Sequence, residues 1–255
     1  MLGWRARIGL LIPSPNSVME SEFFRMCPEG ISVHTARMRF QELTPEGFNA
    51  MDKGVEEGAR QVADVGVRVI VYGCTAGSFI KGLGWDQALA GKMEAATGRK
   101  AITTSTAVVE ALKALGVKRM NLATPYPDDI NQEERRFFES NGFEVVSVRG
   151  LGIRQPEVHY PLNPFPILGI GTLEPYVAFN IGRDAHTPDS DAVFISCTDF
   201  RTLEIIDPLE ADLGKPVISS NLASMYGALR ILRIPPGPGC PGTLMRSFSE
   251  ELKIK

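Results

Sequence analysis

Two of the four cysteines stand at points of the sequence where a thiol could act on a substrate carbon. Cys74 comes two residues after the apolar run 67–72, Cys197 directly follows the apolar run 192–196, and a threonine comes next in both cases. A thiol has an ordinary pKa of about 8.5, and we expect a following helix N-terminus to lower it. Two such thiols that face each other could act as base and acid on opposite faces of one carbon.

The other two cysteines, Cys27 and Cys240, are interpreted as small buried apolar side chains, because one belongs to a helical stretch and the other to the C-terminal tail. The chain has no Cys-x-x-Cys pair and only 3 histidines, so the spacings of zinc sites and of redox motifs are both absent. We predict free thiols, no metal site and a reducing, cytoplasmic location.

A carboxylate that loses its neighbouring proton, or loses carbon dioxide, becomes an enediolate with two negative oxygens, which preorganised hydrogen-bond donors must stabilise. The candidate substrate-binding residues follow the predicted strands: Ser14, Asn16, Thr75, Ser78, Tyr126 and Thr198, with the backbone N–H groups of residues 75–77 and 198–199. Asn16 is a candidate contact for a second carboxylate or a carbonyl group. Helix capping is the alternative role for each hydroxyl. Asp199 could be a cap or could repel a bound anion, and it is left unassigned.

Short apolar runs rich in Val and Ile alternate with longer helical patterns along the whole chain. The predicted strands are residues 7–12, 31–37, 67–72, 100–103, 119–123, 143–148, 192–196 and 216–219. The predicted helices are residues 18–26, 45–63, 85–96, 106–115, 127–140, 173–186, 202–212 and 222–232. Runs without polar alternation are typical of buried parallel strands. The sequence therefore predicts an α/β protein with parallel sheets.

Three ordered matches between the two halves of the chain indicate a duplication. Residues 8–14 resemble residues 120–126, residues 69–75 resemble residues 192–198, and residues 100–105 resemble residues 215–220. We predict two pseudo-symmetric lobes, 1–116 and 117–255, each a short parallel sheet flanked by helices, with terminal helices free to cross between them. Ligands bind beyond the carboxyl ends of parallel strands, so the active site is expected in the cleft between the lobes.

Two segments lack a helix or strand pattern. Residues 156–171 contain four prolines and two aromatic residues, and a loop of this length either covers a site or is a surface insertion. Residues 235–242 are rich in Pro and Gly and are interpreted as irregular chain after the last helix.

Charge and hydropathy exclude several classes of protein. The net charge of −3, without a basic run, argues against a nucleic-acid binder. No segment reaches the roughly 18–20 consecutive apolar residues of a membrane span, and the apolar run 8–13 is too short for a signal peptide. A dinucleotide enzyme is disfavoured because no G-x-G-x-x-G follows the first predicted strand.

At four places the residues resemble one enzyme superfamily. The matching runs are Ile8-Gly-Leu-Leu-Ile-Pro-Ser-Pro-Asn16, Tyr72-Gly-Cys-Thr-Ala-Gly-Ser-Phe79, Leu122-Ala-Thr-Pro-Tyr126 and Ile195-Ser-Cys-Thr198. They resemble the aspartate/glutamate racemase superfamily and, within it, the branch of maleate cis-trans isomerases and arylmalonate decarboxylases. The resemblance covers residues 7–244. It implies two αβ lobes with the active site between them and no metal or organic cofactor. We further expect a small carboxylate or dicarboxylate substrate and no nucleic-acid or membrane partner, and a homo-oligomer stays open.

The resemblance also implies roles for individual residues. Cys74 and Cys197 match the paired catalytic residues of the isomerases and racemases. Thr75 and Tyr126 match donors that stabilise the carboxylate, and Asn16 matches a substrate contact of the isomerases.

Departures from the family pattern bear on the reaction. The decarboxylase has glycine where this chain has Cys74, so two cysteines favour isomerisation or racemisation. Maleate isomerases carry apolar residues where this chain has Thr75-Ala-Gly-Ser78, and amino-acid racemases have Thr-His or Thr-Glu where this chain has Thr198-Asp199. Neither maleate nor an amino acid is therefore singled out as the substrate.

Three hypotheses follow. The first is a two-cysteine isomerase or racemase of a small carboxylate. The second is an arylmalonate-type decarboxylase in which Cys197 donates the proton. The third is a non-catalytic carboxylate-binding module, for which replacement of both cysteines would leave ligand binding intact.

Overall fold

Eight parallel strands form two four-stranded sheets in the computed structural model, which describes residues 2–154 and 169–254. The first sheet has the order β2-β1-β3-β4, with β1 (Ala6–Pro13) and β3 (Val69–Tyr72) in the middle. Its edges are β2 (Ile31–Met38) and β4 (Lys100–Thr103). Both central strands are almost entirely buried, as expected for a parallel sheet that helices cover on both faces.

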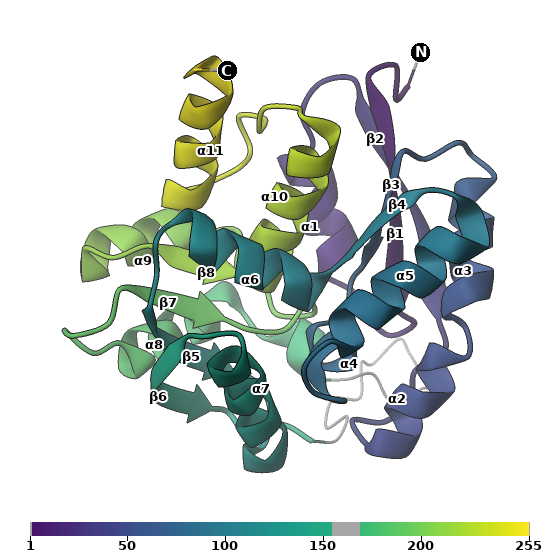
Figure 1. Cartoon of the computed structure of the whole chain (residues 1–255). Coiled ribbons are helices and arrows are strands. Elements are labelled where there is room, and N and C mark those ends of the chain that lie inside the picture. Colours follow the sequence, from purple (N-terminus) through teal and green to yellow (C-terminus); the bar gives the residue numbers. More distant parts are fainter. Residues whose placement is uncertain (1, 155–168, 255) are drawn as a thin grey trace.

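The second sheet repeats the topology of the first. Its order is β6-β5-β7-β8, with β5 (Arg119–Thr124) and β7 (Ala192–Ile195) in the middle. Its edges are β6 (Glu144–Gly150) and β8 (Val217–Ser219). Each strand of the first sheet thus has a counterpart four strands later, and all eight lie at predicted positions. The two-lobe α/β fold is confirmed, and Figure 1 shows the two sheets side by side.

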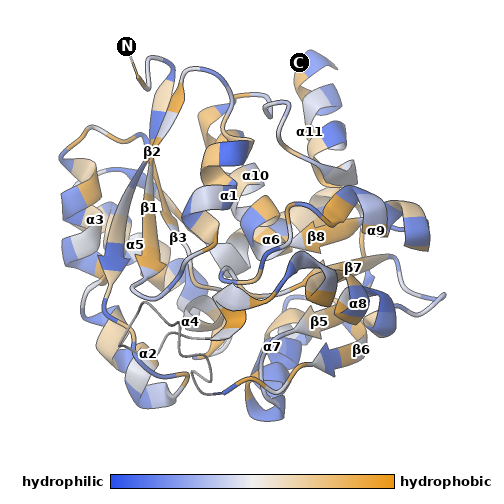
Figure 2. Ribbon diagram, turned by 180° about the vertical axis from the view of Figure 1, so that it is seen from behind, coloured by the Kyte–Doolittle hydropathy of each residue, from blue (hydrophilic) through white to orange (hydrophobic). Residues whose placement is uncertain are grey.

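Helices flank both sheets. In the first half of the chain they are α1 (Met19–Met26), α2 (Pro45–Asp52), α3 (Val55–Ala63), α4 (Thr75–Phe79), α5 (Trp85–Thr97) and α6 (Thr104–Ala114). In the second half they are α7 (Asp128–Ser140), the 3₁₀ turn η1 (Gly169–Thr172), α8 (Pro175–Ala185), α9 (Ile206–Leu213), α10 (Ser220–Leu232) and α11 (Gly242–Ile254). In Figure 2 the central strands β1 and β3 are largely apolar, whereas the outer helices α3 and α7 carry hydrophilic residues.

Three helices differ from the sequence prediction. The predicted helix 45–63 is two helices, because it is interrupted at Gly54, a residue whose backbone freedom disfavours a helix interior. Helix α4 was not predicted, since its five residues are too few to show a helical period. The tail does not end the structure as irregular chain: α11 follows it, and its Leu244, Met245 and Phe248 are buried.

The helix after the last strand of each sheet packs against the other lobe. Helix α10 contacts β3, β4 and α6, and α6 contacts β8. Gly227 of α10 permits this approach, because a Cβ there would lie 2.7 Å from the Cδ1 of Ile102. The proposed lobe boundary between residues 116 and 117 falls between α6 and β5, so both helices pack across it (Figure 1).

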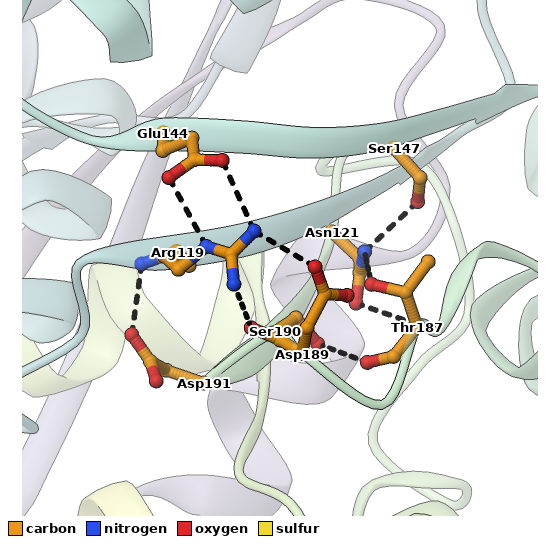
Figure 3. Close-up of polar contacts among 8 residues, drawn as sticks. All are labelled: Arg119, Asn121, Glu144, Ser147, Thr187, Asp189, Ser190 and Asp191. Carbon is orange, nitrogen blue, oxygen red and sulfur yellow. Dashed lines mark hydrogen bonds and ion pairs between the residues drawn. The ribbon is translucent and has the colours of Figure 1, made fainter.

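The N-terminal edge of the second sheet is braced by a polar cluster. The guanidinium of Arg119 pairs with Glu144 at 3.0 Å and with Asp189 at 2.8 Å, and Asp191 accepts the Arg119 backbone N–H (Figure 3). These contacts hold the start of β5 to β6 and to the turn before β7. The cluster lies at the N-terminal ends of the strands, whereas Cys197 follows the C-terminal end of β7. Among the helices of the described residues, none combines the length and apolar character of a membrane span.

Candidate active site

Both candidate catalytic cysteines line one small cavity between the lobes. The cavity has a volume of about 40 Å³. Its polar lining also includes Asn16, Thr75, Tyr126, Thr198 and Asp199. Its apolar lining consists of Pro13, Pro15, Phe40, Leu43, Phe48, Ala76 and Ile170. The sulfurs are thus brought together from opposite lobes, as the duplication predicts, since Cys74 follows β3 and Cys197 follows its counterpart β7.

A larger cavity of about 370 Å³ adjoins this one and shares Leu43 and Phe48 with it. Its described lining contains no cysteine, and its cation, Lys81, is paired with Asp52 at 2.5 Å. The arrangement of chemical groups therefore places the candidate active site in the smaller cavity.

Cys74 is held at the N-terminus of helix α4. It is the residue before the helix, has extended backbone angles, and its sulfur accepts the backbone N–H of Gly77 at 3.4 Å. A Cβ at Gly77 would lie 2.5 Å from the hydroxyl oxygen of Tyr72 and 3.1 Å from the sulfur. Glycine at this position lets the helix turn close tightly over the thiol.

Cys197 has a strained backbone. Its φ is 90°, a value that side chains with a Cβ rarely adopt. Such a conformation costs about 1–3 kcal/mol and persists where surrounding contacts enforce it, often at active sites. Here the next residue supplies contacts: the Thr198 hydroxyl donates to the Gly73 carbonyl at 3.1 Å, and the Thr198 carbonyl accepts from Asn221 at 3.1 Å.

Burial raises the pKa of both thiols, so the expectation of lowered values is wrong. The pKa of Cys74 is about 12, because desolvation outweighs the hydrogen bond from Gly77. Desolvation raises the pKa of Cys197 further, and the Asp199 carboxylate adds to the rise while the Tyr126 hydroxyl opposes it. None of the described residues around the cavity is Lys, Arg or His. Both thiols are therefore protonated at neutral pH.

Asn16 and Thr198 join the two lobes at the cavity. The side-chain N–H of Asn16 donates to the Thr198 hydroxyl at 3.0 Å, and its carbonyl oxygen accepts the backbone N–H groups of Val18 and Met19. Asn16 thus holds the backbone at the start of α1 and links it to the loop that carries Cys197.

Thr75 and Tyr126 also lie at the cavity. The Thr75 hydroxyl is 2.8 Å from the Ser220 hydroxyl, at the start of α10. Tyr126 packs edge-on against Phe79, with ring centroids 6.5 Å apart, and hydrogen-bonds the Cys197 sulfur. Burial raises the pKa of Tyr126 well above its ordinary value, so its hydroxyl stays a donor.

Ser14 and Ser78 are not brought to the cavity. The Ser78 hydroxyl is fully buried and donates to the carbonyls of Cys74 and Thr75, each at 2.9 Å. The Ser14 hydroxyl exchanges hydrogen bonds with the backbone of Phe40 at 3.1 and 3.2 Å. Both hydroxyls hold backbone that lines the site. In the sequence, a hydroxyl with this structural role at a strand end or helix start looks the same as one that binds substrate.

Two buried carboxylates near the site, Glu22 and Glu134, were not predicted, and a third, Asp199, was left without an assigned role. Glu22 of α1 accepts the backbone N–H groups of Thr202 and Leu203 at 2.8 and 2.9 Å and the side chain of Asn221 at 2.7 Å. Glu134 accepts the hydroxyl of the residue before Cys197, Ser196, at 2.6 Å, and burial raises its pKa to about 8. The third, Asp199, lines the cavity. No local pattern distinguishes Glu22 and Glu134 from solvent-exposed acids, because their partners are distant in sequence.

The predicted loop, residues 156–171, lies mostly outside the described residues. Its last residues form η1, which places Ile170 on the cavity wall. Among the described residues, no group of three or more His, Cys, Asp or Glu side chains is arranged to hold a metal ion.

Comparison with known proteins bears out the resemblance. The family model of arylmalonate decarboxylase matches residues 8–245. An arylmalonate decarboxylase from Bordetella bronchiseptica is 31% identical over 224 residues, which are 88% of this chain and 89% of that protein. A maleate isomerase from Pseudomonas putida is 29% identical over 255 residues, 95% of this chain and 98% of that protein.

Solved structures agree with the fold and include one with a cysteine adduct. A cysteine-to-serine variant of the Nocardia farcinica maleate cis-trans isomerase, with a covalently bound succinylcysteine intermediate, has a TM-score of 0.84 at 26% identity, covering 94% of this chain and 98% of that one. A liganded variant of arylmalonate decarboxylase, with one glycine changed to cysteine and one cysteine changed to serine, has a TM-score of 0.83 at 30% identity, covering 94% and 98%. The chain belongs to the arylmalonate decarboxylase family.

Proposed function

We propose that the protein is a cofactor-independent isomerase or racemase that uses Cys74 and Cys197 on a small carboxylate. One observation carries the proposal: the two thiols reach the same cavity from equivalent strands of the two lobes. A carbon held between them presents one face to each sulfur. The names of the relatives, maleate isomerase and arylmalonate decarboxylase, indicate that those enzymes act on small carboxylates. This supports the same class of substrate here.

In the racemase version of the reaction, one cysteine first loses its proton to water, and the resulting thiolate removes the proton next to the substrate carboxylate. The resulting enediolate bears its charge on two oxygens. We assign its stabilisation to the Thr75 hydroxyl, the Tyr126 hydroxyl and the backbone N–H groups that follow each cysteine. The other thiol then donates its proton to the opposite face of the carbon, and proton exchange with water restores both sulfurs.

In the cis-trans version, Cys74 first loses its proton to water, and the thiolate adds to the double bond of an unsaturated carboxylate and forms a carbon–sulfur bond. Cys197 protonates the resulting carbanion. Rotation about the new single bond, removal of the same proton and loss of the thiolate give the trans product. The cysteine adduct in the Nocardia farcinica structure is the type of intermediate that this route requires.

Decarboxylation is the second candidate, and the state of the thiols favours it. A substituted malonate that loses carbon dioxide leaves an enediolate that needs one proton. Because burial raises the pKa of Cys197, its thiol is protonated at rest and suited to donate that proton. Water then reprotonates the thiolate, and Cys74 has no part in the reaction.

We further infer that the protein works in the reducing cytoplasm and binds no nucleic acid. The structure leaves Cys27, Cys74, Cys197 and Cys240 unpaired, which suits a reducing compartment. The net charge of −3 disfavours binding to phosphate backbones. Fractionation of cells and a nucleic-acid shift assay at low salt test these two inferences.

A substrate panel in deuterium oxide separates the candidates. Maleate, aspartate, 2-phenylpropionate and phenylmalonate are incubated with the wild-type protein and with the Cys74→Ala and Cys197→Ala variants. Isomerase or racemase chemistry gives geometric isomerisation, or deuterium uptake with loss of optical purity, and each variant loses about 10²–10⁴-fold in rate.

Decarboxylase chemistry gives carbon dioxide from phenylmalonate, and only the Cys197 variant loses activity. Binding of a carboxylate without turnover, unchanged in both variants, would instead identify a binding module and refute the proposal.

A further inference from the structure

The cavity contains a carboxylate that the proposed chemistry does not use. Asp199 is only 6% exposed, and its Oδ1 accepts the backbone N–H of Ser17 at 2.7 Å and the Ser17 hydroxyl at 3.3 Å. Its Oδ2 is buried without a hydrogen-bond partner among the described residues. A Cβ at Gly171 would lie 2.8 Å from both carboxylate oxygens, so glycine allows the backbone of η1 to close over this group.

The start of helix α1 is occupied by the protein's own acceptors. The first N–H groups of a helix lack partners within the helix and attract anions. Here Asp199 accepts the N–H of Ser17, and the Asn16 carbonyl oxygen accepts those of Val18 and Met19 at 3.1 and 2.9 Å. The Asn16 side-chain N–H already donates to Thr198. The backbone donors at the start of α1 are thus engaged inside the protein, and the bond to Thr198 uses one of the two side-chain N–H donors of Asn16.

The remaining wall of the cavity suits an uncharged group. Phe40, Leu43, Phe48 and Ile170 lie on it, and the rings of Phe40 and Phe48 are 5.2 Å apart. The described lining includes no cation that could neutralise a second anion beside Asp199. A like charge brought next to a buried carboxylate is strongly disfavoured, whereas an apolar group gains free energy on leaving water for such a wall.

We propose that Asp199 determines specificity by excluding a second carboxylate, and that the substrate is a monocarboxylate with an apolar substituent on the reacting carbon. This inference rests on the proposed function and narrows its substrate class. It disfavours maleate and other dicarboxylates whose second carboxylate must stay in the cavity.

A matched pair of ligands tests the inference through binding alone. 2-Methylsuccinate and 2,4-dimethylpentanoate share a carboxylate and a methyl group on carbon 2, and a carboxymethyl group in one replaces an isobutyl group in the other. Dissociation constants are measured by titration calorimetry at pH 8.5, where Asp199, whose pKa burial raises to about 7, is ionised. We expect the wild-type protein to bind 2,4-dimethylpentanoate at least about tenfold more tightly.

The Asp199→Asn variant removes the charge with little change in shape. It should bind 2-methylsuccinate more tightly and so reduce the ratio of the two dissociation constants about tenfold or more. Asp184→Asn, an exposed change in the same lobe, should leave this ratio unaltered. Asp199→Ser serves the same comparison if the first variant does not fold. Equal or tighter binding of 2-methylsuccinate by the wild type, no binding of either ligand, or an unchanged ratio in the folded Asp199 variant would overturn the inference.

Failure of this inference and failure of the proposed function give different results. Cysteine-dependent turnover of a dicarboxylate would refute the specificity role of Asp199 and would leave the proposed two-thiol chemistry intact. The expected binding ratio together with turnover that survives loss of both cysteines would do the reverse.

Discussion

Replacement of Glu22 should release the loop that follows Cys197. Glu22 is a buried side chain of α1, in the first lobe, and it hydrogen-bonds this loop of the second lobe. Its carboxylate accepts two backbone N–H groups, from Thr202 and Leu203, and one side-chain N–H, from Asn221. Asn221 in turn donates to the Thr198 carbonyl at 3.1 Å, next to Cys197. Glu22 is therefore a positioning residue that acts on the site through hydrogen bonds.

The magnitude follows from the donors that lose their acceptor. Glu22→Ala orphans three buried N–H groups, each costing about 1–3 kcal/mol, so the free energy of unfolding should fall by roughly 3–5 kcal/mol after some water enters. Glu22→Gln keeps one oxygen for the two backbone donors but turns an amide N–H toward Asn221. It should lose only about 1–2 kcal/mol.

Urea denaturation measures these changes, and Glu20 provides the matched control on the same helix. Glu20 forms an ion pair with Arg37 at 2.9 Å, with both side chains partly exposed. Glu20→Ala should therefore cost less than about 1 kcal/mol. If Glu22→Ala lost no more than Glu20→Ala, or if Glu22→Gln lost as much as Glu22→Ala, the reasoning about orphaned donors would be refuted.

Three further predictions concern the cysteines. Since burial raises the pKa of Cys74 to about 12, its alkylation by iodoacetamide, measured by peptide mass spectrometry, should accelerate about tenfold per pH unit from pH 7 to pH 9. A plateau of the alkylation rate near pH 8 would contradict this. Since ionised Asp199 raises the pKa of Cys197, Asp199→Asn should speed alkylation of Cys197 at pH 8.5 while Cys74 changes less; equal acceleration of both would count against it. Cys197 has a φ of 90°, whereas Cys74 has extended angles. The loss of stability in the Gly variant relative to the Ala variant, measured by urea denaturation, should therefore be about 1–2 kcal/mol smaller at position 197 than at position 74. The reverse order would refute the strain at Cys197.

The strands and the placement of the cysteines were predictable because the signals are local or repeated. Buried parallel strands are short, nearly continuous apolar runs, and both halves of the chain carry them in the same order. Equivalent positions after β3 and β7 then bring Cys74 and Cys197 to one cavity without any knowledge of side-chain contacts. The departures from single family members were equally visible in the sequence.

What could not be predicted depends on contacts between distant residues. The pKa of a thiol depends on how completely the fold buries it, and at Cys74 this effect exceeds that of the helix N-terminus. The fixed roles of Ser78 and Ser14 come from backbone carbonyls that only the fold brings within reach. Glu22 looks like any acid in the first turn of a helix, and its partners lie about 180 residues away in sequence.

The proposed two-thiol reaction requires two sulfurs that act on opposite faces of one carbon. Its most direct test uses whichever chiral carboxylate the wild-type protein racemises, supplied as each pure enantiomer in deuterium oxide to Cys74→Ala and Cys197→Ala. Both variants should lose racemisation by about 10²–10⁴-fold, and any residual deuterium uptake should favour one enantiomer in the first variant and its mirror image in the second. Racemisation that persists in either variant, or the same enantiomer preference in both, would contradict the account.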